Sequence, residues 1–428
     1  MSRLPRTLAC FAAGLLLALG LTTPTLAQEA TLSEKIVAME QRLEAEFETH
    51  FESDLATVTQ GPDAIAATLA QVGAATSSTP AVLWAIPRAT HLHLVLITPN
   101  GEPVVRDLYD VPKERLEQVV QRFHRQISRP SGLAYQAPAT QLYDWLIGTL
   151  EAEFLEPAGV DTLLVCMGDG LRGLALPALY DGSQFLVEKY SLSRIPAFNL
   201  IDTDYEAIEP GSVLAMGASE FEELEPLPAV PVELQTIDWQ LRSAQSNQRQ
   251  WQSRSVLNQA FTLNNFNTLL GRQPYDIVHL ATHAEFRPGA PQDSYIQLWD
   301  SRLTLDQMRN LNWQLPSLEL LVLSACETAV GDSSAELGFA GLALNAGAKS
   351  AVASLWDVSD AGTLALMAEF YGQIAQGLPK AEALGRAQMR LLQGEASPAL
   401  ARLSKQAEVT DFSHPFYWAG FSLISSPW

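Results

Sequence analysis

Apolar positions in the N-terminal part of the chain recur with the period of a helix. Between residues 31 and 57 the apolar side chains follow one another at intervals of three or four positions among acidic residues: Ile36, Met39, Leu43, Phe47, Phe51 and Leu55. This spacing predicts an amphipathic helix that stops near Gly61 and Pro62. A second, shorter helix is expected over residues 63–72, before a turn rich in Ser and Thr.

From residue 81 onward the apolar residues gather into short runs. Runs at 82–86 and 92–97 indicate strands, and helical patterns follow at 112–127 and 140–154. Five nearly continuous apolar runs then alternate with helical segments, at residues 162–167, 213–217, 277–282, 318–324 and 350–355. Such runs are typical of strands buried in a parallel sheet. The pattern predicts an α/β fold in which a mostly parallel sheet carries helices on both faces.

The first 27 residues have the pattern of a targeting segment. Arg3 and Arg6 precede an apolar stretch over residues 8–21, and Thr25-Leu26-Ala27 places small residues before Gln28. The apolar stretch is shorter than the ~20 residues that a spanning helix needs. We therefore expect a signal peptide at residues 1–27, a secreted or periplasmic mature chain, and no stable membrane insertion after cleavage. An uncleaved anchor is the alternative.

The charge balance narrows the choice of partners. The chain has 27 basic and 48 acidic residues, for a net charge of −21. A surface this acidic repels phosphate backbones and anionic lipids, so no nucleic acid partner is expected. It attracts basic proteins or peptides instead.

Cleavage before Gln28 would leave two cysteines, Cys166 and Cys326. Two cysteines in a chain of this length do not make a disulfide scaffold. Either the two pair with each other, or each has a separate role. Cys166 lies inside the apolar run 162–167, so the sequence favours a small buried core residue there.

Two of the apolar runs lead into reactive side chains. One reads Asp276-Ile277-Val278-His279-Leu280-Ala281-Thr282-His283-Ala284, and the other reads Leu320-Leu321-Val322-Leu323-Ser324-Ala325-Cys326-Glu327-Thr328. Sites in parallel α/β sheets form at the carboxyl ends of neighbouring strands. If the strands ending at Thr282 and Ser324 are adjacent, His283 and Cys326 meet there. An imidazole beside a thiol is the minimum that cysteine nucleophilic catalysis requires.

These two segments resemble the signature of CHAT domains, the caspase-like domains named for their association with caspases and tetratricopeptide-repeat proteins. The motifs that carry the resemblance are Ala281-Thr282-His283, Ser324-Ala325-Cys326-Glu327-Thr328, Ala335-Glu336-Leu337-Gly338-Phe339, Ser354-Leu355-Trp356-Asp357-Val358-Ser359-Asp360 and His414-Pro415-Phe416-Tyr417-Trp418. The resemblance covers roughly residues 80–428. With the targeting pattern and the helical spacing of the N-terminal part, it gives three predicted parts: a signal peptide at 1–27, an N-terminal helical segment at 28–80 and a CHAT domain at 81–428.

The resemblance also implies a mechanism, because the family is grouped with caspases and separases in a peptidase clan that uses a His/Cys dyad. It makes His283 the base and Cys326 the nucleophile, with the backbone amides of Ala284 and Cys326 as the oxyanion donors. Many relatives have Gly where this chain has Ala284. Alanine keeps the N–H but restricts the backbone if a positive φ is needed.

Metal ions and other cofactors are not expected. The spacing of His279 and His283 would suit zinc on a helix, but the surrounding residues indicate a strand, and no Cys/His cluster completes a site. His279 is expected to be a buried imidazole with hydrogen-bond partners.

Two carboxylates follow the run that should lie beside the cysteine strand. Asp357 and Asp360 could hold the guanidinium of an Arg before the scissile bond by charge-assisted hydrogen bonds. Asp360 could equally be the N-cap of the helix that starts at Ala361. Asp332 and Glu336 are weaker candidates for the same role.

Together these features predict a secreted cysteine endopeptidase that cuts peptide bonds, preferably after Arg or Lys, through His283 and Cys326. The alternative is a non-proteolytic CHAT module that scaffolds a protein partner. The sequence leaves open the physiological substrate, the oligomeric state and any need for proteolytic activation.

Overall fold

The computed structural model describes residues 30–55, 59–99, 101–206, 210–243, 250–308, 310–311, 318–328, 332–395 and 411–428, excepting the side chains of 325–328. The expected signal peptide at 1–27 lies outside these residues.

The secondary structure alternates strands and helices along the chain. The strands are β1 (Pro80–Pro87), β2 (Leu92–Ile97), β3 (Val104–Leu108), β4 (Thr162–Met167), β5 (Ser191–Ile195), β6 (Ser212–Gly217), β7 (Gln252–Leu257), β8 (Ile277–Phe286), β9 (Tyr295–Gln297), β10 (Arg302–Thr304), β11 (Leu320–Thr328), β12 (Ser350–Ser354) and β13 (Phe421–Ser425). The helices are α1 (Leu32–Phe51), α2 (Pro62–Thr76), α3 (Lys113–Ile127), α4 (Gln136–Tyr143), α5 (Val230–Ser243), α6 (Leu263–Leu270), α7 (Leu305–Met308), α8 (Ser333–Ala340), α9 (Leu342–Ala346), α10 (Asp360–Ile374) and α11 (Lys380–Leu392). Two π-helical turns, Asp144–Gly148 and Glu151–Leu155, continue α4.

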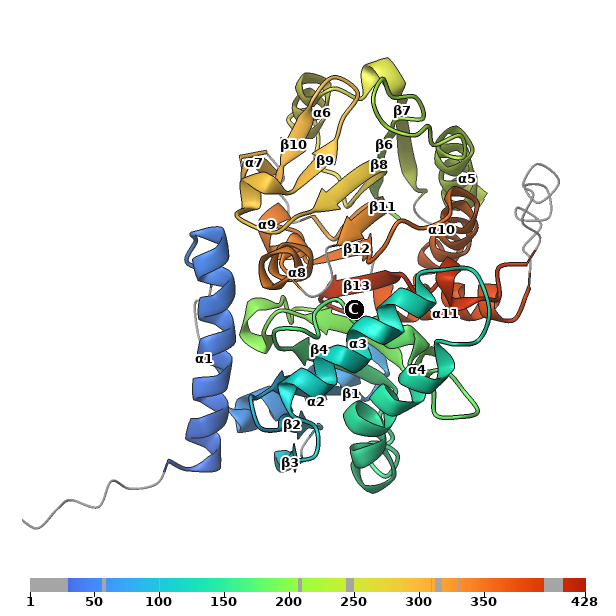
Figure 1. Cartoon of the computed structure of the whole chain (residues 1–428). Helices are drawn as coiled ribbons and strands as arrows, with labels where there is room; N and C mark the ends of the chain where they lie inside the picture. The colour runs from blue at the N-terminus through green and yellow to red at the C-terminus, as the bar shows by residue number, and fades with distance from the viewer. Residues whose placement is uncertain are drawn as a thin grey trace, which may run out of the picture.

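One twisted sheet joins the strands in the order β10-β9-β8-β11-β12-β13-β5-β4-β1-β2-β3, and β6 and β7 branch from β8 (Figure 1). The pairs of β8 with β6 and β11 are parallel, as are those of β11 with β12 and of β4 with β1 and β5. Antiparallel pairs occur at the β1–β2–β3 end, at β9 and β10, and between β12 and β13. The prediction of a mostly parallel α/β sheet is confirmed.

Helices cover both faces of this sheet, and the alternation of side chains along β1 shows how. Val82, Trp84 and Ile86 pack into an apolar cluster with α1 and α2. The residues between them, such as Leu83, belong to the larger cluster that includes α3 and α4. A strand buried on both faces must be apolar at every position, which explains the continuous apolar run of β1.

The N-terminal helix α1 begins with a capping box. The Thr31 hydroxyl accepts a hydrogen bond from the backbone N–H of Glu34 (3.2 Å), and the Glu34 carboxylate accepts one from the N–H of Thr31 (2.7 Å). These bonds satisfy two of the orphan donors at the helix start. The helix ends at Phe51, about ten residues before the predicted stop near Gly61 and Pro62.

A buried carboxylate joins α1 to the sheet. Glu40 is fully buried and accepts hydrogen bonds from the indole N–H of Trp84 and from the backbone and side-chain N–H groups of Asn199 (3.2 and 3.1 Å). Burial raises the pKa of Glu40 to about 7, because the desolvated carboxylate is disfavoured more than these donors stabilise it.

This buried group predicts a pH-dependent stability. Between its ordinary pKa of 4.5 and about 7, native Glu40 keeps a proton that the unfolded chain releases. The free energy of unfolding therefore falls as pH rises through this window, by on the order of 2–3 kcal/mol. Urea denaturation at pH 5 and pH 8 measures the fall, which we expect to be smaller by that amount in Glu40→Gln.

The exposed Glu102 provides a matched control. Glu102→Gln should show the same fall as the wild type. If the profiles of Glu40→Gln and the wild type run parallel, Glu40 does not titrate in this window.

Candidate functional site

The strands β8 and β11 are adjacent and parallel, as predicted. Both continue beyond the expected ends at Thr282 and Ser324, so His283 and Cys326 lie inside strands rather than after them. The predicted ends were wrong because pairing resumes with Cys326 opposite Ala284 and continues to the ends of both strands.

A β-bulge lies at this point of β8. Between the pairs Ser324–Ala281 and Cys326–Ala284, β11 advances by two residues while β8 advances by three. The extra residue falls at Thr282–His283. The Thr282 hydroxyl donates to the carbonyl of Gln297 in β9 (2.7 Å), which helps to hold the bulge. Bulges turn a side chain away from the regular alternation and are frequent next to active sites.

The His283 imidazole is partly exposed and held by one loop. Its Nε2 lies 2.8 Å from the carbonyl oxygen of Glu225, and its ring meets Phe221 edge to face with centroids 4.8 Å apart. A carbonyl can only accept, so Nε2 carries the hydrogen. In the neutral ring Nδ1 is then the basic atom.

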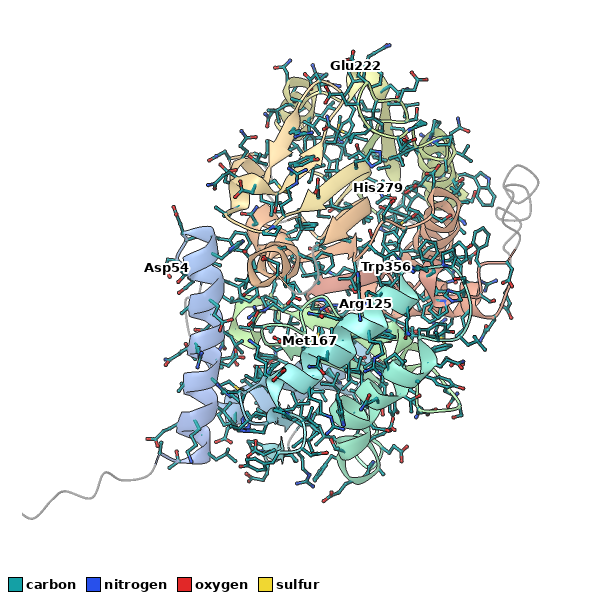
Figure 2. All side chains as sticks on the ribbon, in the orientation of Figure 1. Asp54, Arg125, Met167, Glu222, His279 and Trp356 are labelled. Carbon is teal, nitrogen blue, oxygen red and sulfur yellow. The ribbon has the colours of Figure 1, made fainter. Side chains whose placement is uncertain are left out.

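The loop that holds His283, residues 218–229, is itself well connected. The backbone N–H of Leu227 donates to the carbonyl of Ser219 (3.0 Å), and the Asn258 side chain accepts from the N–H of Ser219 (2.8 Å). The loop carries exposed glutamates, including Glu222 at the outer surface (Figure 2). The contact of this loop with His283 was not predicted from the sequence, because no local pattern encodes it.

Asp360 fastens the same loop to α10. Its Oδ2 accepts a hydrogen bond from the N–H of Ala229 (2.7 Å). The N-cap expectation for Asp360 was wrong, because the Ser359 hydroxyl caps the helix by accepting from Gly362 N–H, and Asp360 is the first helical residue. Burial raises the pKa of Asp360, an effect that the Ala229 hydrogen bond and nearby His283 only partly offset.

The other three carboxylates that the sequence suggested for binding Arg or Lys lie in different surroundings from Asp360. Asp357 is exposed, in the turn between β12 and α10. Asp332 is the N-cap of α8, and the N–H groups of the first turn lower the pKa of its carboxyl. Glu336 is buried and accepts from the N–H of Gly170 (3.2 Å). The last two therefore have structural partners.

The backbone of Cys326 lies in β11, and its side chain lies outside the described residues. Ala284, the other predicted oxyanion donor, pairs with Cys326 on one side and with Ile296 of β9 on the other. Its φ is not positive. Alanine at this position therefore carries no backbone strain.

Buried polar contacts connect β8 to the helices α5 and α10 that cover one face of it. His279 Nε2 lies 2.9 Å from Glu233 Oε1 of α5, and Nδ1 lies 3.1 Å from the Tyr371 hydroxyl of α10. All three side chains are buried, and Figure 2 shows His279 inside the fold between strands and helices. The prediction of a buried, hydrogen-bonded His279 is confirmed.

Cys166 and Cys326 cannot form a disulfide with each other in this fold. Cys166 is in β4, and β5, β13 and β12 lie between it and the cysteine strand β11. Four strand spacings correspond to about 19 Å, whereas a disulfide requires Cα atoms within about 7 Å. Cys166 is buried, its sulfur contacts the carbonyl of Pro196 (3.1 Å), and burial raises the pKa of its thiol.

Comparison with known structures gives likenesses at low identity. Gingipain R, described as an Arg-specific cysteine proteinase, is 13% identical over 73% of each chain, with a TM-score of 0.41. Separase from Saccharomyces cerevisiae, in complex with securin, is 9% identical over 85% of this chain and 31% of its own, with a TM-score of 0.44.

A curated relative matches a shorter stretch. Tetratricopeptide repeat protein 28 of Mus musculus is 34% identical over 113 residues, which are 26% of this chain and 4% of the mouse protein. The chain thus spans a small part of that relative's length. Among the helices that the structure describes, none is long and apolar enough to cross a membrane.

The family comparison covers most of the sheet. Residues 136–426, which run from α4 through β13 and include both β8 and β11, match the CHAT domain. The domain boundaries predicted at residues 27 and 80 remain predictions. On this match, the chain belongs to the CHAT domain family.

Proposed function

We propose that the protein is a cysteine endopeptidase in which His283 and Cys326 form the catalytic dyad. The observation that carries this proposal is the bulge in β8, which presents a partly exposed His283 next to the backbone position of Cys326. The Glu225 carbonyl supplies the third, orienting group that an activated nucleophile and its base require.

The proposed reaction proceeds in two steps. The Cys326 thiol loses its proton to His283 Nδ1, and the thiolate attacks the peptide carbonyl. The oxyanion accepts hydrogen bonds from the amides of Ala284 and Cys326. His283 returns the proton to the leaving amine, which departs and leaves a thioester. Water, deprotonated by His283, then hydrolyses the thioester and releases the acid and the thiol.

Replacing either member of the dyad should abolish hydrolysis. We expect Cys326→Ala to lower kcat/KM by at least about 10³-fold, and His283→Gln by roughly 10²–10⁴-fold. Cys166→Ala, the matched control at the buried cysteine, should retain activity. The measurement is cleavage of fluorogenic peptides by purified mature chain.

Two outcomes would contradict the proposal. Hydrolysis that persists in Cys326→Ala would exclude this nucleophile. A folded wild-type protein that cleaves no peptide in the panel and shows no selective labelling of Cys326 by an acyloxymethyl ketone would favour the scaffolding alternative.

We propose further that the enzyme prefers Arg or Lys before the cut. Asp357 and Asp360 both follow β12, which pairs with the cysteine strand β11. The exposed Asp357 is the better charge for a guanidinium, because Asp360 is engaged by the Ala229 N–H. Asp360 then acts as a positioning residue for the loop that holds His283. The net charge of −21 also attracts cationic peptides.

These two roles predict different kinetic effects. Asp357→Asn should lower kcat/KM for Arg and Lys peptides by about tenfold through KM and leave Leu peptides unchanged. Asp360→Ala should lower kcat for every peptide, and Asp360→Asn, whose amide oxygen can still accept from Ala229, should restore most of it. A panel with Arg, Lys, Asp and Leu at the cleavage position measures both. A preference for Asp would refute this assignment.

Export is part of the proposal, since residues 1–27 carry the pattern of a signal peptide. We expect the mature chain to begin at or near Gln28, outside the cytoplasm. Mass spectrometry of the protein from its native host measures the N-terminus. Recovery of an intact Met1 chain from the cytoplasm would overturn the expectation.

A further inference from the structure

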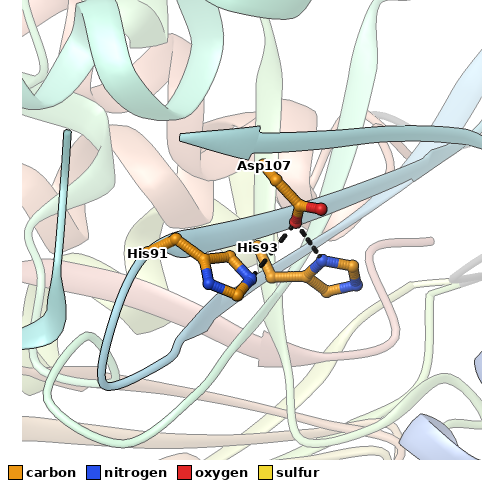
Figure 3. Close-up of side chains that lie close together, drawn as sticks. All are labelled: His91, His93 and Asp107. Carbon is orange, nitrogen blue, oxygen red and sulfur yellow. Dashed lines mark hydrogen bonds and ion pairs between the residues drawn. The ribbon is translucent and has the colours of Figure 1, made fainter. Parts of the chain in front are cut away.

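A group of potential metal ligands lies at the β2–β3 end of the sheet, far from the proposed dyad. His91, His93 and Asp107 bring one ligand atom each within 4.8 Å of one another (Figure 3). His91 Nε2 lies 3.4 Å from Asp107 Oδ1, and His93 Nδ1 lies 2.6 Å from the same oxygen. In the sheet order, β12, β13, β5, β4 and β1 separate this cluster from β8 and β11.

The backbone holds the three residues in register. His93 of β2 pairs directly with Asp107 of β3. His91 lies in the turn just before β2 and brings its Nε2 to the same carboxylate oxygen. The hairpin turn between β1 and β2 is closed by reciprocal backbone hydrogen bonds between Arg88 and His91 (2.8 and 3.3 Å).

A hydroxyl orients the first imidazole. His91 Nδ1 lies 3.0 Å from Thr90 Oγ1, so its Nε2 is the nitrogen that points toward Asp107. A partner of this kind on the second ring nitrogen is common for histidines that bind metals, because it fixes the orientation of the ring.

The cluster is partly open to solvent, with side-chain exposures of 20% for His91, 23% for His93 and 31% for Asp107. An ion can therefore enter, and water can complete its coordination. Arg106, next to Asp107 in the sequence, does not compete for the Asp107 carboxylate. Successive strand residues face opposite sides, and the Arg106 guanidinium binds Glu153 (2.7 Å).

We propose that His91, His93 and Asp107 form a zinc site. Two imidazole nitrogens and one carboxylate oxygen are a donor set that Zn²⁺ accepts, with water in the fourth position. Tetrahedral bonds of about 2.0–2.1 Å place ligand atoms about 3.4 Å apart, which matches the His91–Asp107 distance. The His93–Asp107 contact opens by roughly 0.7 Å when zinc replaces the hydrogen-bonded proton.

The proposed ion would link an edge strand to its neighbour. β3 ends the sheet order and is only partly buried along its length. A metal that joins Asp107 to the two histidines adds a connection between β3 and β2, at an edge where few buried side chains stabilise the strand pairing. The site departs from the expectation of no metal, and it is independent of the proposed peptidase activity.

Isothermal titration of the metal-free, tag-free mature chain with ZnCl₂ tests the site. We expect one ion per chain and a higher thermal midpoint with zinc. His93→Gln and Asp107→Asn should each weaken binding by at least tenfold. Asp110→Asn, an exposed carboxylate in the turn after β3, and His414→Gln, a histidine elsewhere on the chain, are the matched controls and should bind as the wild type does. The titration is repeated on Cys326→Ala to remove a competing thiol.

Two results overturn the proposal. One is the absence of stoichiometric binding, which would leave His93 and Asp107 as a hydrogen-bonded pair only. The other is a change in affinity at the wrong residue: if Asp107→Asn binds zinc as tightly as Asp110→Asn, or if Cys326→Ala loses zinc binding, the ion binds elsewhere on the chain. If His93→Gln does not fold, the comparison of Asp107→Asn with Asp110→Asn decides.

Discussion

The parallel pairing of β8 with β11, interrupted by one bulged residue, is the constraint on which the candidate site depends. Regular pairing through this region would continue the alternation that places His279 and Ala281 against α5 and α10. The extra residue at Thr282–His283 changes that alternation while Ala284 still pairs with Cys326. The backbone positions of His283 and Cys326 are thus set by the hydrogen bonding between these two strands.

Two sets of polar contacts make this arrangement rigid. On the α5 side of β8, the buried side chains of His279 and Glu233 lie 2.9 Å apart and connect this strand to α5. The loop at residues 218–229 contacts His283 through the Glu225 carbonyl, and Asp360 fastens this loop to α10. The imidazole is therefore oriented by groups that belong to the fold and are in place without a substrate.

Sequence patterns predicted most of the fold because buried parallel strands are apolar at nearly every position. The runs at 162–167, 213–217 and 277–282 fall on β4, β6 and β8, and the CHAT motifs pointed to the neighbouring strands β8 and β11. The bulge was not predictable, since it arises from the register between two distant segments. The choice of Ser359 over Asp360 as the cap of α10 was also missed, because both residue types cap helices and a shift of one residue is within the uncertainty of any helix start.

The central claim, that His283 acts on the Cys326 thiol across the bulge, is tested most directly by the pH dependence of iodoacetamide alkylation at Cys326. The buried Cys166 does not compete, since burial raises the pKa of its thiol. A free thiol with a pKa of about 8.5 reacts slowly near pH 6.5. The account predicts that wild-type Cys326 reacts at pH 6.5 at least ten times faster than a free thiol, and that His283→Gln abolishes this advantage. Identical profiles for the two proteins would contradict it.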